Sequence, residues 1–285
     1  AIVINGMSLE ETINLTDIFI KSGEIYDLSS VNDIIIDKHS TGGVGDTTTL
    51  VVGPIVAACG CHMAKVSGKG LGITGGTIDK LESIPGFNVN LTEKQFITNL
   101  KNVGFVDSSQ TKKLVPLDKV IYNLRNNSGT TESLPLIASS IMSKKIASGA
   151  DIILIDIKVG KGALIKTKKD ATKLSTWMKK IGNVYNKKVV TIITDMNTPL
   201  SNSIGNRLEV EEAIKVLKGE KCRLYDISKE IASILISLAK KVTIDEAGNL
   251  VDEVINNRKA YKKFIEFCEA QGGDIKKLKI VANQL

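Results

Sequence analysis

The chain has 285 residues, of which 42% are hydrophobic and 24% charged, a composition typical of a soluble globular protein with one large domain or two. Its net charge of +7 comes mainly from lysines spread along the chain, and its aromatic content of 4% is too low for a surface that stacks single-stranded bases, so we expect no nucleic-acid partner. No apolar run is long enough to cross a bilayer, so we expect no membrane partner.

The two ends of the chain suggest a larger protein. The chain starts at Ala1 rather than at a methionine and ends at Leu285 without a helix-terminating signal, so we expect a fragment or a processed piece. Near the start, Ser8 and Glu11 have the spacing of a capping box, which predicts a helix that runs to about Lys21.

Strands and helices alternate after this first helix. The expected strands are β-branched runs over 33–36, 62–66, 104–106, 151–157 and 188–194. The expected helices cover 48–58, 92–103, 133–147, 169–186 and 207–218, and 222–271 is helical with a turn near 247–249. Continuous apolar strands that alternate with helices predict an α/β fold with a mostly parallel sheet, covered by helices on both faces.

A glycine-rich segment over 37–49 follows the first strand and opens the next helix. Its glycines let backbone N–H groups point at one place, and the helix N-terminus adds the positive end of its dipole. One lysine and three hydroxyl side chains add further donors, namely Lys38, Ser40, Thr47 and Thr49. These groups predict a site for a phosphate-like anion, beside which His39 adds a group that can carry a proton near neutral pH.

A second glycine-rich segment, from Ser67 to Thr77, follows the next strand. Because loops after parallel strands converge on one edge of a sheet, we expect Ser67 and Thr77 to lie near the first segment. The alternative is a pair of ordinary tight turns, but two such loops after successive strands favour a site. The glycine spacing fits neither a dinucleotide site nor a P-loop, so we expect no organic cofactor.

A third group of residues lies over 118–125 and 133–145. Ser140 and Lys144 are four residues apart on a predicted helix and project from one face, beside apolar neighbours. Such a surface suits a flat heterocycle with polar edges, although a solvent-facing serine and lysine would look the same. Arg125 favours the functional interpretation, because arginine is scarce in this chain and has a planar fork of donors that lysine lacks.

The cysteines lack the spacing of a metal site or a disulfide framework. Cys59 and Cys61 stand close together, but no second pair of ligands accompanies them, and Cys222 and Cys268 stand alone in apolar contexts. We therefore expect buried free thiols and a cytoplasmic location.

Four runs together carry a family resemblance: DKHSTGGVGD, SGKGLGITGGTIDKLESIPGF, ESLPLIASSIMSKKIASGAD and DIKVGKGALIKT. With their relative spacing, they resemble the pyrimidine-nucleoside phosphorylase and thymidine phosphorylase family over about 6–273. The resemblance implies a pentosyltransferase of nucleoside salvage. It would reversibly cleave uridine- or thymidine-type nucleosides with inorganic phosphate, giving the free base and (deoxy)ribose 1-phosphate. It also implies a homodimer, and a C-terminal α+β part of the family that this chain lacks.

The resemblance assigns residues to roles. The implied phosphate ligands are Lys38, Ser40, Gly42, Gly43, Thr49, Ser67 and Thr77. The pyrimidine would lie against Tyr122, Arg125, Ser140 and Lys144, and His39, Arg125 and Lys144 would be catalytic, with His39 near a base carbonyl. Some members hold a monovalent cation such as K⁺, and the matching positions are Gly45, Thr47, Leu200, Ser203 and Glu212.

The resemblance also implies two domains with a cleft that closes. A small helical domain would comprise 1–20 and 116–147 and bind the base, and an α/β domain would comprise 21–115 and 148–285 and bind phosphate. The chain departs from the family pattern at Lys69, Ile73, Asn126, Lys161 and Leu164.

Two alternatives remain open. One is a phosphoribosyltransferase of the anthranilate type, which is related in fold and also uses a glycine-rich phosphate loop. It would need a magnesium and pyrophosphate site, and no paired acidic motif is evident. The other is a degenerate or truncated copy that binds nucleoside without turnover.

Overall fold

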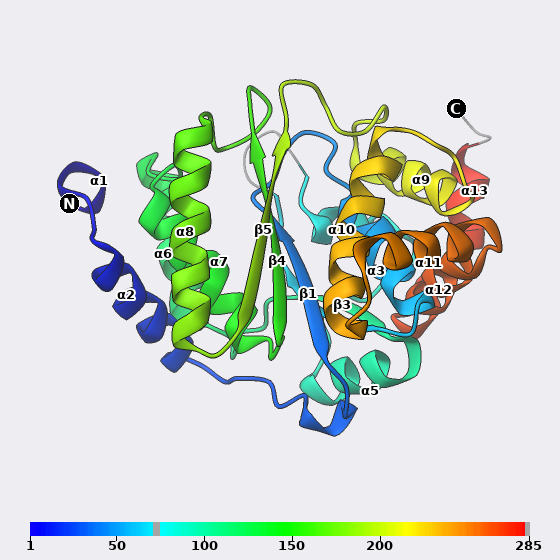
Figure 1. The fold of residues 1–285 in the computed structure, drawn as a ribbon, viewed down its shortest axis with the longest axis horizontal. Helices are drawn as coiled ribbons and strands as arrows, with labels where there is room; N and C mark the ends of the chain where they lie inside the picture. Colours follow the sequence, from blue (N-terminus) through cyan, green and yellow to red (C-terminus); the bar gives the residue numbers. More distant parts are fainter. Residues whose placement is uncertain (71–74, 283–285) are drawn as a thin grey trace.

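The computed structural model describes residues 1–70 and 75–282, so Ile73 lies outside the described residues. Its centre is a five-stranded parallel sheet with the strand order β3-β2-β1-β4-β5 (Figure 1). The strands are β1 (Ile35–Ser40), β2 (His62–Ser67), β3 (Phe105–Ser109), β4 (Ile152–Val159) and β5 (Lys188–Asp195). This arrangement confirms the predicted α/β fold.

Helices cover both faces of the sheet (Figure 1). On one side lie α2 (Leu9–Lys21), α6 (Pro116–Ser128), α7 (Leu134–Ala147) and α8 (Lys168–Val184). On the other side lie α3 (Thr48–Ala58), α9 (Asn206–Leu217), α10 (Arg223–Lys240), α11 (Ile244–Asn256) and α12 (Lys259–Ala270). Shorter or peripheral elements are α1 (Ile2–Asn5), a 3₁₀ turn (Ser29–Val31), α4 (Thr77–Glu82), α5 (Glu93–Val103) and α13 (Ile275–Ala282).

Alternation along the strands divides the core between the two faces. Ile36 of β1 packs into a cluster with α3 and α10, whereas Ile35 packs on the opposite side with α2 and α5. On that opposite side, α7 shares a buried cluster with β4 and α8. Of the segments expected to form a small helical domain, α7 is therefore packed into the core of the sheet.

The structure corrects two of the predicted boundaries. β1 was expected over 33–36 but continues to Ser40, because residues 36–40 pair in parallel with β4. Lys38 and His39 are therefore strand residues, with fixed and opposite orientations, and not part of a turn.

The predicted turn near 247–249 is wrong, because these residues lie inside α11. The helix begins with a complete capping box between Thr243 and Glu246 and buries apolar side chains at helical spacing, which outweighs the low helix propensity of Gly248. The chain instead reverses at Lys241 and Arg258, both in the left-handed region with φ of 58° and 65°. Within the described residues, no helix is long and apolar enough to cross a membrane.

Gly53 of α3 determines how closely this helix approaches the sheet. A Cβ added there would lie 2.4 Å from a ring carbon of Phe105 on β3.

We expect Gly53→Ala to lower the free energy of unfolding by about 1–3 kcal/mol through overpacking. The matched control is Gly248→Ala in α11, where the nearest neighbouring atom is 3.7 Å away. That change should raise stability by about 0.5–1 kcal/mol. Urea denaturation of both variants measures the difference, and equal effects of the two changes would contradict this account.

Candidate functional site

The glycine-rich segments follow the carboxyl ends of β1 and β2, at one edge of the sheet. In the parallel register, Ser40 is paired with Asp156 of β4, and Ser67 with Ser109 of β3. Both expected anion-binding segments therefore start from one edge, where ligands bind in open α/β sheets.

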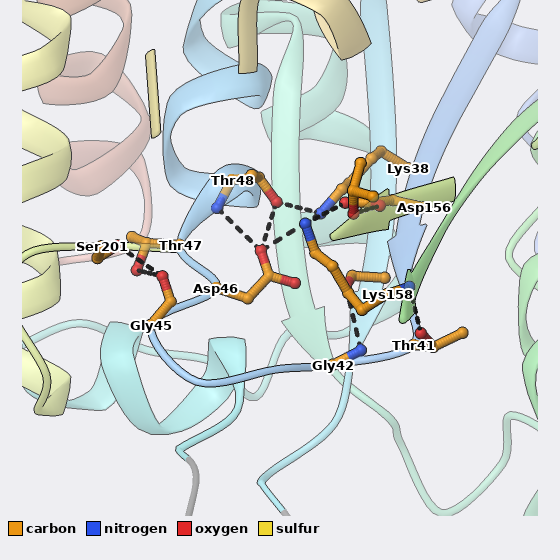
Figure 2. Close-up of polar contacts among 12 residues, drawn as sticks. Lys38, Thr41, Gly42, Gly45, Asp46, Thr47, Thr48, Asp156, Lys158 and Ser201 are labelled. Carbon is orange, nitrogen blue, oxygen red and sulfur yellow. Dashed lines mark hydrogen bonds and ion pairs between the residues drawn. The ribbon is translucent and has the colours of Figure 1, made fainter. Parts of the chain in front are cut away.

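Lys38 lies at the centre of a buried group of charges at this edge (Figure 2). Its side chain is 1% exposed, its ammonium group donates to the Thr48 hydroxyl, and it lies 3.9 Å from the Asp46 carboxylate. Beside it, Lys158 and Asp156 form a fully buried ion pair at 2.7 Å. Lys38 thus lies at the carboxyl end of β1, and its ammonium group already has partners in the chain.

Burial and charge shift the pKa values of this group in opposite directions. Burial lowers the pKa of Lys38 to about 8, although Asp46 and Asp156 favour its charged form. Burial alone would raise the pKa of Asp46, yet Lys38 and Lys158, with hydroxyls of Ser40 and Thr48, hold it well below its usual value. Asp46 therefore remains ionised and balances part of the lysine charge.

The first glycine-rich segment is held close to the loop that follows β4. A Cβ added at Gly43 would lie 2.6 Å from the terminal methyl of Met196, which would have to move, and 3.3 Å from the Gly162 carbonyl. The Ser40 hydroxyl accepts the Gly42 N–H at 3.1 Å, which orders the turn. Thr49 lies in the first turn of α3 and is almost fully buried.

The second segment contributes Ser67 at the end of β2 and Thr77 as the first residue of α4. The Ser67 hydroxyl donates to Asp107 at 2.9 Å, and burial raises the pKa of this carboxyl group to about 7. Both predicted residues therefore lie at the expected edge, and Ser67 is engaged by a carboxyl group that the sequence did not single out.

His39 lies on the face of β1 opposite Lys38, towards α7. Burial, followed by the charges of Lys145, Lys65, Lys144 and Lys38, lowers its pKa well below 6.5. His39 is therefore a neutral imidazole near pH 7, and not the proton carrier that its residue type suggests. The charges that act on His39 include Lys38, one of the expected phosphate-binding residues, and Lys144, one of the expected base-binding residues.

The expected base-binding residues lie together between α6 and α7. Lys144 donates to Ser140 at 2.7 Å and forms an ion pair with Asp118 at 2.6 Å. The Lys144 ammonium and the Arg125 guanidinium carbon each lie 5.6 Å from the centre of the Tyr122 ring. The predicted shared face of Ser140 and Lys144 is confirmed.

The Arg125 side chain is buried against backbone carbonyls, and the sequence did not indicate this burial. It is 5% exposed, and its fork donates to the carbonyls of Leu136 at 3.3 Å and Thr131 at 2.6 Å. Its Nε is buried without a hydrogen-bond partner among the described residues. An unsatisfied buried donor of this kind is costly and is a candidate contact for a ligand oxygen.

A fully buried ion pair connects the expected base-binding residues with the expected phosphate-binding residues. Lys145, next to Lys144 on α7, pairs with Asp37 of β1 at 2.8 Å and donates to the Val66 carbonyl of β2 at 3.0 Å. The helix that is expected to bind the base, α7, is thus attached to β1 and β2, the strands that lead to the two glycine-rich segments.

The expected cation ligands also lie together. The Thr47 hydroxyl donates to Glu209 at 2.7 Å, and the Gly45 carbonyl accepts the Ser201 hydroxyl at 2.5 Å. Glu212 accepts the N–H groups of Asn202 and Ser203 at 2.9 and 2.6 Å, and Leu200 donates its N–H to Val44 at 3.0 Å. These groups supply oxygen atoms, the ligand type of a hard cation, but each of these contacts already lies within the chain.

The departures from the family pattern lie around the loop after β4 and at two exposed positions elsewhere. Lys161 is exposed, and Leu164 is half-buried against the cluster of α7 and α8. Lys69 is exposed and pairs with Glu82 at 2.8 Å, and Asn126 is exposed on α6.

Several charged residues of the site were missed in the sequence: Asp37, Asp46, Lys65, Lys80, Asp107, Asp118, Lys145, Asp156, Lys158 and Glu209. One signal was available. A charge inside a β-branched strand, as in the run IILIDIKV of β4, is seldom buried without a partner, so it indicates an ion pair.

Comparison with known proteins defines the class to which this fold and site belong. Residues 32–261 match the family model described as "Glycosyl transferase family, a/b domain". The chain therefore belongs to the glycosyl transferase family.

Among curated proteins, the chain is 50% identical over 276 residues to the pyrimidine-nucleoside phosphorylase of Bacillus subtilis (strain 168). It is 48% identical over 276 residues to that of Geobacillus stearothermophilus. Both alignments cover 96% of this chain and 64% of the relative, so the chain spans less than two thirds of the length of these relatives. The resemblance inferred from the sequence motifs is confirmed.

Solved structures show the same fold at low sequence identity. Anthranilate phosphoribosyltransferase from Thermus thermophilus is 15% identical, with a TM-score of 0.72 over 94% of this chain and 87% of that chain. The enzyme from Saccharomyces cerevisiae, in complex with PRPP and Mg, is 12% identical, with a TM-score of 0.71 over 92% of this chain and 80% of that chain. At these identities the likeness concerns the fold alone.

The neutral state of His39 can be measured directly, because the chain has two histidines. The variant His62→Gln leaves a single imidazole, whose proton NMR signals then belong to His39. We expect these signals to titrate well below pH 6.5, because burial and the four lysines oppose protonation. Since the unfolded chain binds this proton more readily, the contribution of His39 to stability should decrease as pH falls below about 6.5. A titration midpoint at or above 6.5 would contradict the assigned environment.

Proposed function

We propose that the chain carries the phosphorolysis site of a pyrimidine-nucleoside phosphorylase. This site would convert a uridine- or thymidine-type nucleoside and inorganic phosphate to the free base and (deoxy)ribose 1-phosphate. The observation that carries the proposal is the buried ion pair between Lys145 and Asp37 at 2.8 Å. It attaches α7, which bears Ser140 and Lys144, to β1, which bears Lys38 and His39. The identity of 50% to a curated pyrimidine-nucleoside phosphorylase supports the same conclusion.

Phosphate is the nucleophile in this proposal. Lys38 and the N–H groups of the first glycine-rich segment would hold it, together with Ser40, Thr49, Ser67 and Thr77. Glycosidic cleavage builds positive charge on the sugar, and an anion fixed beneath that carbon would both stabilise the charge and form the new C–O bond. The orientation of two bound reactants can supply roughly 7–11 kcal/mol of the barrier reduction.

The departing base takes the electron pair of the glycosidic bond and becomes anionic. Lys144 and Arg125 are placed to stabilise that charge, and Tyr122 lies beside both cations. A neutral His39 would donate its ring N–H to a base carbonyl, which needs no change of protonation state. Asp118 would hold the Lys144 ammonium in position between turnovers.

The finer properties of the complete protein belong to the same proposal. We infer a homodimer, a cytoplasmic location and closure of the base-binding helices onto the phosphate site. The cysteines are free thiols, which suits a reducing compartment. K⁺ would bind between the first glycine-rich segment and the segment over 200–212, whose oxygen atoms suit it.

The competing function is a phosphoribosyl transfer of the anthranilate type, since the anthranilate phosphoribosyltransferases share the fold. It needs acidic ligands for magnesium, and the described residues contain no group of three or more histidine, cysteine, aspartate or glutamate side chains that could hold a metal.

Release of uracil or thymine from its nucleoside only when phosphate is present would support phosphorolysis. Consumption of phosphoribosyl pyrophosphate with anthranilate would support the alternative. Nucleoside binding without turnover, measured by calorimetry, would support a non-catalytic copy. Repeating the assay with K⁺ replaced by choline tests whether the reaction depends on K⁺, and we expect a lower rate in choline.

Lys144→Met is expected to lower kcat/KM for the nucleoside by about 10²–10³-fold, because it removes a charge that stabilises the departing base. The control is Lys119→Met, which removes an exposed lysine of α6 next to Asp118 and should leave the rate unchanged. Steady-state kinetics on both purified variants measures the effect. A loss of less than about fivefold in Lys144→Met would contradict this assignment, since a single charge-assisted contact is worth more than that.

The Lys38 pKa of about 8 predicts a pH dependence for phosphate. Above about pH 8 the ammonium loses its proton in the free protein, so kcat/KM for phosphate should fall as pH rises through that value. Phosphate itself is fully in its dianionic form there and cannot cause the decrease. In Lys38→Arg the charge persists to higher pH, so the decrease should disappear even if the overall rate is lower. The same decrease in both proteins would show that another group titrates.

A further inference from the structure

Lys80 has a buried ammonium group that the proposed reaction does not use. It lies on α4, just after the second glycine-rich segment, and is 3% exposed. A lysine is almost never buried to this degree without partners, so the atoms that surround it define its role.

Three oxygen atoms from separate parts of the chain surround this ammonium group. Two are carbonyl oxygens that accept hydrogen bonds, and the third belongs to a carboxylate that forms an ion pair. They are the Asp46 carbonyl at 3.0 Å, the Gly75 carbonyl at 3.1 Å and the Glu209 carboxylate at 3.1 Å. Asp46 belongs to the first glycine-rich segment, Gly75 to the second, and Glu209 to α9. Two of the three donors of the ammonium group thus bind carbonyl oxygens, and its charge is paired with Glu209.

The acceptors are themselves fixed by other contacts. The Glu209 carboxylate also accepts the Thr47 hydroxyl at 2.7 Å and the Gly205 N–H at 3.1 Å, so it holds the first segment directly as well. Next to Lys80, Asp79 accepts the N–H groups of Gly70 and Gly76 at 2.7 and 2.8 Å, which holds these two glycines close together. Two adjacent residues of α4 therefore fix described residues of the second segment and attach Gly75 to the first segment.

We propose that Lys80 and Glu209 are positioning residues that hold the two glycine-rich segments at one fixed separation, so that both can contact the same anion. The anion is phosphate if the proposed function holds, and this inference rests on that function for its ligand. Neither residue contacts the substrate. Their effect is to place Ser67 and Thr77 opposite the Lys38 segment before phosphate arrives, which removes an ordering cost from binding.

The test uses the double variant Lys80→Met with Glu209→Gln, which removes both charges and avoids an unpaired buried carboxylate. Hydrogen exchange is followed by mass spectrometry in peptides over 42–49 and 75–82. We expect exchange to become at least about tenfold faster in both segments, because each loses its attachment to the other. The control is Lys113→Met, which breaks an exposed ion pair with Glu24 and should change neither segment.

Kinetics separate positioning from general destabilisation. In the double variant, KM for phosphate should rise about tenfold while KM for the nucleoside stays within about twofold, because α6 and α7 are not attached to Lys80. Faster exchange confined to 75–82, or an unchanged KM for phosphate, would overturn the proposal. A wild-type chain without phosphorolysis would refute the proposed function, and the exchange measurement would still decide whether Lys80 links the two segments.

If the double variant does not fold, Lys80→Ala is measured with and without added methylammonium. This small cation can occupy the vacated position, whereas tetramethylammonium is too large. Restored exchange protection in both segments with methylammonium alone would support the proposal, and no difference between the two cations would overturn it.

Discussion

The pairing of buried lysines is the constraint on which this site depends. Lys38, Lys80, Lys145 and Lys158 are each at most 3% exposed, and each lies within ion-pair distance of an aspartate or glutamate. A buried ammonium group without such a partner would lose far more hydration energy than packing could return. Lys158 and Asp156 both belong to β4, but the other three pairs join separate parts of the chain. The requirement to pair them therefore connects β1, α4, α7, α9 and the first glycine-rich segment.

The same charges determine what the site can do chemically. They place paired ammonium groups where the strands end, and the lysine charges, together with burial, keep His39 neutral. Lys145 has a further consequence, because its pair with Asp37 attaches α7 to β1. Any closing motion that moves Lys144 towards bound phosphate must carry this pair along or take place in the segments around α7, such as α6.

The fold leaves more than one chemistry open. Anthranilate phosphoribosyltransferases share it at 12–15% identity, with TM-scores of 0.71 and 0.72. A parallel sheet with an anion site after its strands serves any reaction in which a phosphate group meets a pentose. In the proposed function, the residues around Tyr122 and Lys144 select the base, which would place substrate choice in the helices beside the sheet.

The sequence by itself determined the α/β class, the edge at which the site lies and the grouping of Ser140 with Lys144. It could do so because β-branched runs, glycine-rich turns and helical spacing are local signals. It did not determine that β1 extends through Lys38 and His39, nor that residues 247–249 are helical, because strand pairing and capping outweighed local propensity. Only the tertiary structure decided the protonation of His39, the inward orientation of Arg125 and the link through Lys80. Each of these depends on burial and on charges that lie far apart in the chain and meet only when it folds.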